Sequence, residues 1–395
     1  MKLGKKYWVA IVCKLIVIFV TFLISIFINR GLGVEQKGEY VYIISVIEML
    51  YVILSFGIGQ SYSTFKRSSG EEARGIFVAL SLIHGGIVLL VGVSIITRLE
   101  IEHGITIVVL TALSVTKVII TMMAVIEESI KRNIILTVIN IVYLVVLAIL
   151  YLTNKCNLTS VIICYAVNDI ITIIALMKIY KLKPSLKGTN IEILKSIYNT
   201  GFMTMIVMLL ISVNYHIDTI MLKMMSSSYH AGLYSVGVTF SNMFLLIPDS
   251  FKEVLFGDST KKDFAKSVAI TSIKVSLMTS GLILIGFILF GRFVILMLYG
   301  SDYVPSYSLT LILFIGSLSM IFFKILQPIY ISHGSQKKAA IFLACSAVTN
   351  IIANMLFIPK LNSIGAAIAT AISYTVCGVS FLLGYVKEGK RVANN

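Results

Sequence analysis

Four lysines stand inside long apolar stretches of this chain, where a positive charge is costly. An ionisable group at the centre of a membrane helix costs at least ~2.5–3.5 kcal/mol on insertion scales, so it usually faces a cavity or a partner. A lysine ammonium binds phosphate or pyrophosphate as a point charge. The pattern therefore predicts a site for an anionic substrate, with the candidate binding residues Lys14, Lys117, Lys274 and Lys324.

The depth of each lysine decides between this interpretation and a plainer one. Lys14 and Lys274 lie about two turns from the ends of their apolar stretches, where a side chain can also snorkel to the membrane surface. Lys117 and Lys324 lie deeper. The deeper pair is the stronger indication of a polar interior.

Three carboxylates share the apolar stretches with the lysines. Glu48, Asp169 and Asp218 are candidates for binding a coupling ion, H+ or Na+. Asp169 is central in its stretch, where it is either a buried pairing partner or a proton site. Asp218 is near the outer end of its stretch, and an interfacial position is the alternative for it.

The composition requires membrane helices to carry these groups. Of the 395 residues, 58% are hydrophobic and only 13% are charged, and the mean hydropathy is +0.96. A soluble domain has about a quarter of its residues charged. The fold class predicted is therefore an all-α integral membrane protein, because lipid leaves no partner for open backbone groups.

About 20 apolar residues are needed to cross the bilayer as a helix. This length predicts about twelve transmembrane helices, at 8–29, 40–65, 75–97, 104–126, 133–153, 158–177, 198–222, 231–251, 268–290, 304–331, 339–357 and 363–386.

Lysine and arginine counts orient these helices. The two ends and the even-numbered connections carry 22 of the 33 basic residues, and the odd-numbered connections carry 7. Basic residues collect on the cytoplasmic side, so both termini are expected in the cytoplasm. The net charge of +15 is explained by this membrane face, and nucleic-acid binding is not needed to account for it.

The longest connection, near residues 178–197, separates six predicted helices from six. We expect two lobes, residues 1–185 and 186–395. Gly38-Glu39-Tyr40 and Gly232-Leu233-Tyr234 follow the first and seventh helices at an offset of 194 residues, which indicates related halves repeated in one orientation.

Several functions lack the residues they need. Of the five cysteines, four lie inside apolar segments without metal-ligand spacing, so neither disulfides nor a metal site are expected. The chain has no nucleotide-binding loop and no nucleophile or zinc-protease motif. The loops are short. We therefore expect a protein that is not an enzyme, that carries no cofactor, and that takes its energy from an ion gradient or the membrane potential.

Four short motifs carry a family resemblance. They lie after the first predicted helix, between the seventh and eighth, before the tenth and at the start of the twelfth. In order they are Arg30-Gly31-Leu32-Gly33 with Gly38-Glu39-Tyr40, Asp218 with Gly232-Leu233-Tyr234, Leu298-Tyr299-Gly300-Ser301-Asp302-Tyr303, and Ile358-Pro359 with Ile364-Gly365-Ala366-Ala367-Ile368-Ala369-Thr370. Together they make the chain resemble the bacterial polysaccharide-export flippases, which translocate O-antigen and capsule repeat units. That superfamily includes the MATE exporters and the lipid II flippases.

The resemblance implies two six-helix lobes around a central cavity with alternating access, in the bacterial inner membrane. It also implies a polyprenyl-pyrophosphate-linked oligosaccharide as substrate and partner, and cationic residues in the cavity. Membrane lipids and the polymerase of the same pathway are further expected partners. Two alternatives stay open, a MATE-like ion-coupled exporter of small cationic compounds and a membrane enzyme of polysaccharide assembly.

Overall fold

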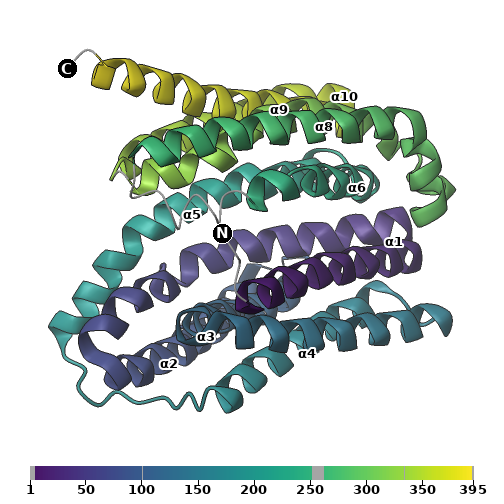
Figure 1. The fold of residues 1–395 in the computed structure, drawn as a ribbon. Helices are drawn as coiled ribbons and strands as arrows, with labels where there is room; N and C mark the ends of the chain where they lie inside the picture. Colours follow the sequence, from purple (N-terminus) through teal and green to yellow (C-terminus); the bar gives the residue numbers. More distant parts are fainter. Residues whose placement is uncertain (1–4, 100, 251–261, 333, 394–395) are drawn as a thin grey trace. The chain divides into compact units, whose positions relative to one another are not determined.

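The structure, a computed structural model, describes residues 5–99, 101–250, 262–332 and 334–393. Within these residues all regular secondary structure is helical (Figure 1). The elements are α1 (Lys5–Leu54), α2 (Ile58–Leu99), α3 (Gly104–Leu152), α4 (Leu158–Ile179), α5 (Ile191–Met225), α6 (Ser228–Phe244), α8 (Lys262–Tyr299), the short 3-10 helix η1 (Ser301–Tyr303), α9 (Ser306–Ser332) and α10 (Gln336–Ala393).

Eight helices of the described residues are long and apolar enough to cross a membrane. The chain is therefore a multi-pass membrane protein. Four elements, each of 42 residues or more, are long enough for two crossings, since the 49 residues of α3 would extend roughly 70 Å against a hydrocarbon core of about 30 Å. Each of the four is interrupted by one residue outside helical geometry: Gly33 in α1, Gly70 in α2, Glu128 in α3 and Asn362 in α10.

The chain forms two compact units. Unit 1 comprises residues 1–33 and 43–209, and unit 2 comprises residues 34–42 and 210–395. Both α1 and α5 contribute to each unit, because the unit boundaries fall inside them. The two units are described separately below.

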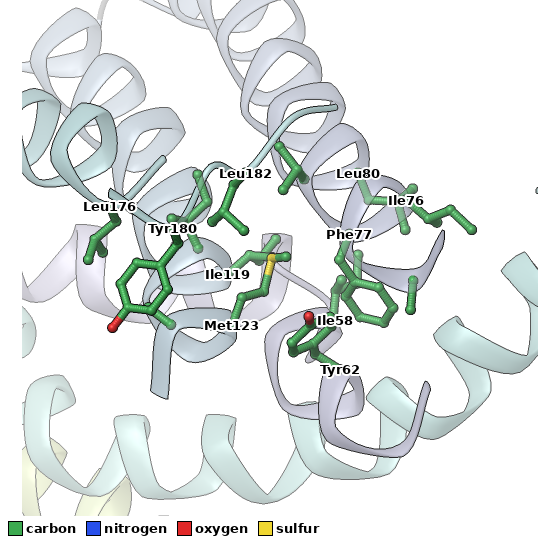
Figure 2. Packing of buried hydrophobic residues seen from close by; sticks show 14 of the residues in the cluster. Ile58, Tyr62, Ile76, Phe77, Leu80, Ile119, Met123, Leu176, Tyr180 and Leu182 are labelled. Atoms are coloured by element: carbon green, nitrogen blue, oxygen red, sulfur yellow. The ribbon is translucent and has the colours of Figure 1, made fainter. Parts of the chain in front are cut away.

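The core of unit 1 forms where α2, α3 and α4 pack together (Figure 2). Phe77 of α2, Ile119 of α3 and Leu176 of α4 are completely buried. Tyr180 and Leu182, from the connection after α4, close the same cluster (Figure 2). This packing fixes α3 against α4, and these two helices carry the main polar pair of unit 1.

The sequence predicts one helix over residues 40–65, and the structure corrects this by dividing the range between two helices. The structure ends α1 at Leu54 and begins α2 at Ile58. Phe56 and Gly57 between them have positive φ angles of 52° and 65°. The carbonyl oxygen released at Leu54 is bonded by His84 Nδ1 at 2.9 Å, and His84 Nε2 lies 2.7 Å from the Tyr198 hydroxyl. His84 of α2 thus supplies the hydrogen bond that the Leu54 carbonyl lacks at the break, and Tyr198 of α5 supports His84.

Unit 2 is built on α9, which packs against α6, α8 and α10. Phe244 of α6 stacks on Phe314 of α9, with ring centroids 4.8 Å apart. Residues 34–42, from α1, join this unit through an ion pair between Glu39 and Lys223 of α5 at 2.6 Å. Glu39 also accepts a hydrogen bond from Ser228, at the start of α6.

Candidate functional site

Two of the predicted site residues form one ion pair in unit 1. Lys117 Nζ on α3 lies 2.7 Å from Asp169 Oδ1 on α4. The Asp169 side chain is 0% exposed, whereas the Lys117 side chain is 28% exposed. The lysine is therefore accessible from outside unit 1, and the carboxylate behind it is not.

Aromatic and acidic groups surround this pair. The Tyr165 ring lies under the Lys117 ammonium, 5.3 Å from nitrogen to ring centroid, a distance suited to a cation–π interaction. Glu48 on α1 interacts electrostatically with Lys117 and with Asp169, and it shares a hydrogen bond with Tyr51. The structure thus brings together three of the predicted residues: Glu48, Lys117 and Asp169.

Unit 2 holds a second pair of the same kind. Lys324 Nζ on α9 lies 2.9 Å from Asp249, and the Tyr215 ring of α5 lies 5.5 Å from the ammonium. The Lys324 side chain is 14% exposed and Asp249 is 34% exposed. Each unit thus pairs one deep lysine with an aspartate and a tyrosine. In the second pair the aspartate has partial access to solvent.

Asp218 is enclosed in unit 2. Asp218 on α5 is 1% exposed, so neighbouring side chains shield its carboxyl group from solvent. Oδ1 accepts hydrogen bonds from the amides of Asn350 at 2.9 Å and Asn354 at 2.5 Å, both on α10. The hydroxyl groups of Tyr234 and Thr370, bonded to each other at 2.7 Å, lie near the carboxyl group.

A second buried polar layer lies one helical turn from Asp218. The Asn214 side chain bonds Ser346 at 2.6 Å and Ser373 at 3.2 Å, and its amide donates to the Leu343 carbonyl at 3.2 Å. Polar groups buried in membrane helices are expensive unless they are paired. The two layers form an oxygen-rich interior joining α5 to α10, with chemistry suited to a proton or a small cation.

The remaining predicted lysines are not joined to these clusters by any recorded contact among the described residues. Lys274 on α8 is exposed. Lys14 lies in α1, but its side chain is outside the described residues.

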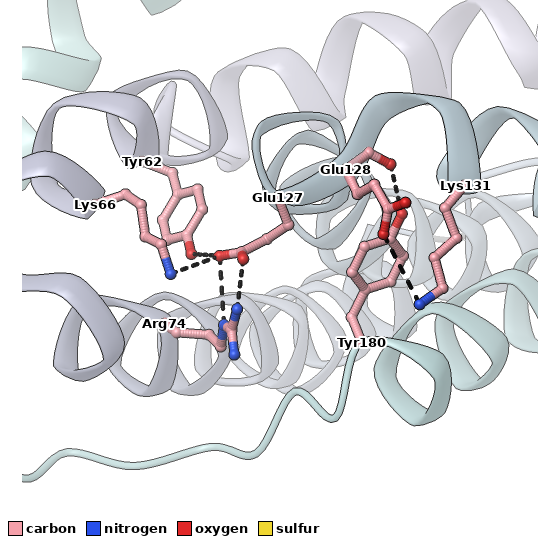
Figure 3. Close-up of polar contacts among 7 residues, drawn as sticks. All are labelled: Tyr62, Lys66, Arg74, Glu127, Glu128, Lys131 and Tyr180. Carbon is pink, nitrogen blue, oxygen red and sulfur yellow. Dashed lines mark hydrogen bonds and ion pairs between the residues drawn. The ribbon is translucent and has the colours of Figure 1, made fainter. Parts of the chain in front are cut away.

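One polar network was missed in the sequence. Glu127 at the end of the first part of α3 accepts hydrogen bonds from Tyr62 and from Arg74, and it forms an ion pair with Lys66 at 3.0 Å (Figure 3). Lys66 and Arg74 flank the break at Gly70. No spacing rule connects them to Glu127, because they meet only when α2 packs on α3.

The neighbouring residue makes a looser set of contacts. Glu128 lies 3.9 Å from Lys131, and its main-chain carbonyl accepts a hydrogen bond from the Tyr180 hydroxyl at 2.7 Å (Figure 3). Burial raises the pKa of the Tyr180 phenol above its ordinary value, so the hydroxyl keeps the proton that it donates. Three connections therefore meet at one end of unit 1. They are the break at Gly70 in α2, the break at Glu128 in α3, and the connection that follows α4.

The tyrosines under the lysines were also missed. Tyr165 stands one turn before Asp169, so the spacing could have indicated it. Tyr215 belongs to α5 and Lys324 to α9, and nothing in the sequence links them.

The fold is shared with solved membrane transporters. The lipid II flippase MurJ in an inward closed conformation gives a TM-score of 0.76 at 15% identity, covering 95% of this chain and 87% of that chain. An inward-facing multidrug resistance MATE family transporter of the MOP superfamily gives 0.73 at 14% identity, covering 92% and 94%. An outward-facing one gives 0.65 at 15%, covering 95% and 93%.

At these identities the likeness establishes the fold alone. No curated protein matches the chain. A sequence profile of one family does match it, over residues 3–256, which is more than half of the chain. The chain belongs to the polysaccharide biosynthesis protein family.

Proposed function

We propose that this protein is a flippase that moves a polyprenyl-pyrophosphate-linked oligosaccharide from the cytoplasmic to the outer leaflet of the bacterial inner membrane by alternating access. The observation that carries the proposal is the accessible lysine of the Lys117–Asp169 pair, a cation held deep in apolar helices of a polysaccharide biosynthesis family member. One protein with this fold is a lipid II flippase.

The proposal includes twelve transmembrane helices in two six-helix lobes, residues 1–185 and 186–395, around a central cavity with both termini cytoplasmic. The interruptions at Gly33, Gly70, Glu128 and Asn362 support it, since each lies between two predicted crossings. The meeting of three even-numbered connections near Glu127 and Tyr180 is also what strict alternation requires.

In this proposal the pyrophosphate binds the cavity lysines, which are Lys14, Lys117, Lys274 and Lys324. The sugars occupy a hydrated lumen and the polyprenyl tail stays in lipid. Lys117 and Lys324 are the principal contacts, because each is presented by an aspartate and a tyrosine that hold it in place.

Energy would come from a coupling ion, H+ or Na+, bound at carboxylates. Asp218 is the leading position, since two amides, a tyrosine and a threonine converge on it inside unit 2. Glu48 and Asp169 are the corresponding groups of unit 1.

A MATE-like exporter of small cationic compounds is the second candidate. It is favoured by the likeness to MATE structures and by the carboxylate that neutralises each deep lysine. In that case the acids would be essential and the lysines dispensable.

The deciding experiment follows lipid-linked repeat units, resolved by leaflet, in cells depleted of the protein. Wild type should relieve their build-up on the cytoplasmic leaflet, whereas Lys117→Ala and Lys324→Ala should not. Lys131→Ala is the matched control, since Lys131 is an exposed lysine paired loosely with Glu128. Normal export by both cavity variants would contradict the proposal. Hypersensitivity to cationic dyes without any build-up would favour the exporter.

A further inference from the structure

The sequence indicates that Lys117 binds the substrate anion and that Asp169 is either a buried pairing partner or a proton site. In the structure the two residues form one ion pair at 2.7 Å. An anion that binds the Lys117 ammonium competes with Asp169 for the same positive charge. Binding at one group must therefore change the state of the other.

The surroundings of Asp169 decide what happens when the lysine is drawn away. The groups that face it are Lys117 and Ser114 from α3, and Glu48 from α1. Tyr165 also interacts with Asp169, and Tyr51 and Tyr143 lie near Tyr165. Among these residues Lys117 is the one cation, and Glu48 is a second acid.

A carboxylate with 0% exposure is very costly to leave charged without a partner. Loss of the lysine would also leave it opposite Glu48, and like charges in one site disfavour ionisation. The buried acid relieves both costs by taking up a proton from solvent.

We propose that binding of a pyrophosphate-bearing substrate at Lys117 is coupled to uptake of one proton by Asp169. The ion pair between Lys117 and Asp169 breaks, the lysine pairs with a phosphate oxygen, and a solvent proton binds the freed carboxylate. The coupling rests on the proposed function, since it requires an anionic substrate.

The second pair supplies the contrast. Asp249, the partner of Lys324, is 34% exposed, so water can solvate its charge when the lysine leaves. Proton uptake is therefore assigned to the pair in unit 1 alone.

The test uses the purified full-length protein and farnesyl pyrophosphate as the probe, with farnesol as the uncharged control. Titration calorimetry at one pH in two buffers of different ionisation enthalpy measures the protons taken up per probe bound. Wild type should take up about one proton more than Asp169→Asn, because the amide cannot be protonated in its place. Asp249→Asn should keep the wild-type value.

A measurement on the wild-type protein guards against a variant that fails to fold. The infrared difference spectrum on adding farnesyl pyrophosphate should gain a protonated-carboxyl band that farnesol does not produce. Equal proton uptake by wild type and Asp169→Asn, or no such band, would overturn the coupling while leaving the flippase proposal intact. Uptake that is lost in Glu48→Gln and kept in Asp169→Asn would overturn the assignment to Asp169. No binding of farnesyl pyrophosphate beyond that of farnesol would instead count against the proposed function.

Discussion

Gly38 lies directly against the main-chain carbonyl group of Ser228, and Gly232 lies in the same way against the carbonyl group of Val34. Val34 and Ser228 are separated by 194 residues, and so are Gly38 and Gly232. The two contacts are therefore reciprocal, as expected where equivalent segments of a repeat meet across a local two-fold axis. Both contacts lie inside unit 2, where residues 34–42 pack on the start of α6.

This contact predicts that Gly38→Ala and Gly232→Ala destabilise the protein. A Cβ atom at either position would overlap main-chain atoms, which cannot move aside as a flexible side chain could. We expect a loss of about 1–3 kcal/mol for each variant, measured as a lower midpoint of thermal unfolding in detergent. Gly281→Ala is the control, because open space surrounds Gly281 on α8. Equal unfolding midpoints for all three variants would show that the close contacts at Gly38 and Gly232 do not contribute to stability.

Adjacent glutamates give the next prediction. Glu127 is largely buried and accepts hydrogen bonds from Tyr62 and Arg74 as well as an ion pair from Lys66. Glu127→Gln removes the charge that these groups share, and we expect it to cost about 1.5–3 kcal/mol. Thermal unfolding should therefore begin at a lower temperature than in wild type.

Glu128→Gln provides the comparison for that variant. The Glu128 side chain is 63% exposed and 3.9 Å from Lys131, and exposed pairs of this kind contribute little. Its unfolding midpoint should stay close to that of wild type. If Glu128→Gln is as unstable as Glu127→Gln, the network around Glu127 is not what joins α2 to α3.

Hydrophobicity and charge predicted the all-helical membrane fold, because the bilayer imposes length and polarity on each segment by itself. The break at residues 55–57 was not predictable in this way. It depends on His84 and Tyr198, which are far apart in the sequence and contribute hydrogen bonds only after the helices pack. An apolar stretch shows that a helix is long enough to cross the membrane. It does not show where a side chain of a neighbouring helix takes the place of a backbone hydrogen bond.

The same distinction applies to the site. Burial cost alone pointed to Lys117 and Asp169, since any charge in an apolar helix needs an explanation. It could not reveal that they satisfy each other, because pairing depends on the rotation of α3 relative to α4. Asn350 and Asn354 reach Asp218 only when α10 packs on α5, and the sequence does not show that contact.

Tyr198→Phe tests the bonded break directly. The change removes the hydroxyl that lies 2.7 Å from His84 Nε2 and keeps the ring that packs on Phe56. We expect a loss of about 1 kcal/mol in the free energy of unfolding, together with faster hydrogen exchange at residues 54–58. Tyr229→Phe is a suitable control, since Tyr229 is an exposed tyrosine of α6. Unchanged exchange at the break would mean that His84 holds the Leu54 carbonyl without help from Tyr198.

Asp218→Asn tests whether the buried set in unit 2 binds a coupling ion. A ligand that binds only the folded protein stabilises it by about 2.7 kcal/mol at a concentration 100 times its dissociation constant. If Na+ occupies the set, the unfolding midpoint of wild type should rise when NaCl replaces choline chloride at equal ionic strength. If a proton occupies it, the midpoint should instead rise as the pH falls, because the folded protein then binds more protons than the unfolded chain.

Either response should disappear in Asp218→Asn, because the amide carries no charge for a cation and cannot gain a proton at this pH. Lys131→Ala changes an exposed lysine of unit 1 that is paired loosely with Glu128, and it should keep the wild-type response. The variant also separates binding from packing, since asparagine preserves the volume between Asn350 and Asn354. A wild-type midpoint that ignores both Na+ and pH would show that Asp218 serves only to join α5 to α10. A response that persists in Asp218→Asn would place the coupling ion elsewhere, and the Glu48–Asp169 cluster of unit 1 would be the next position to test.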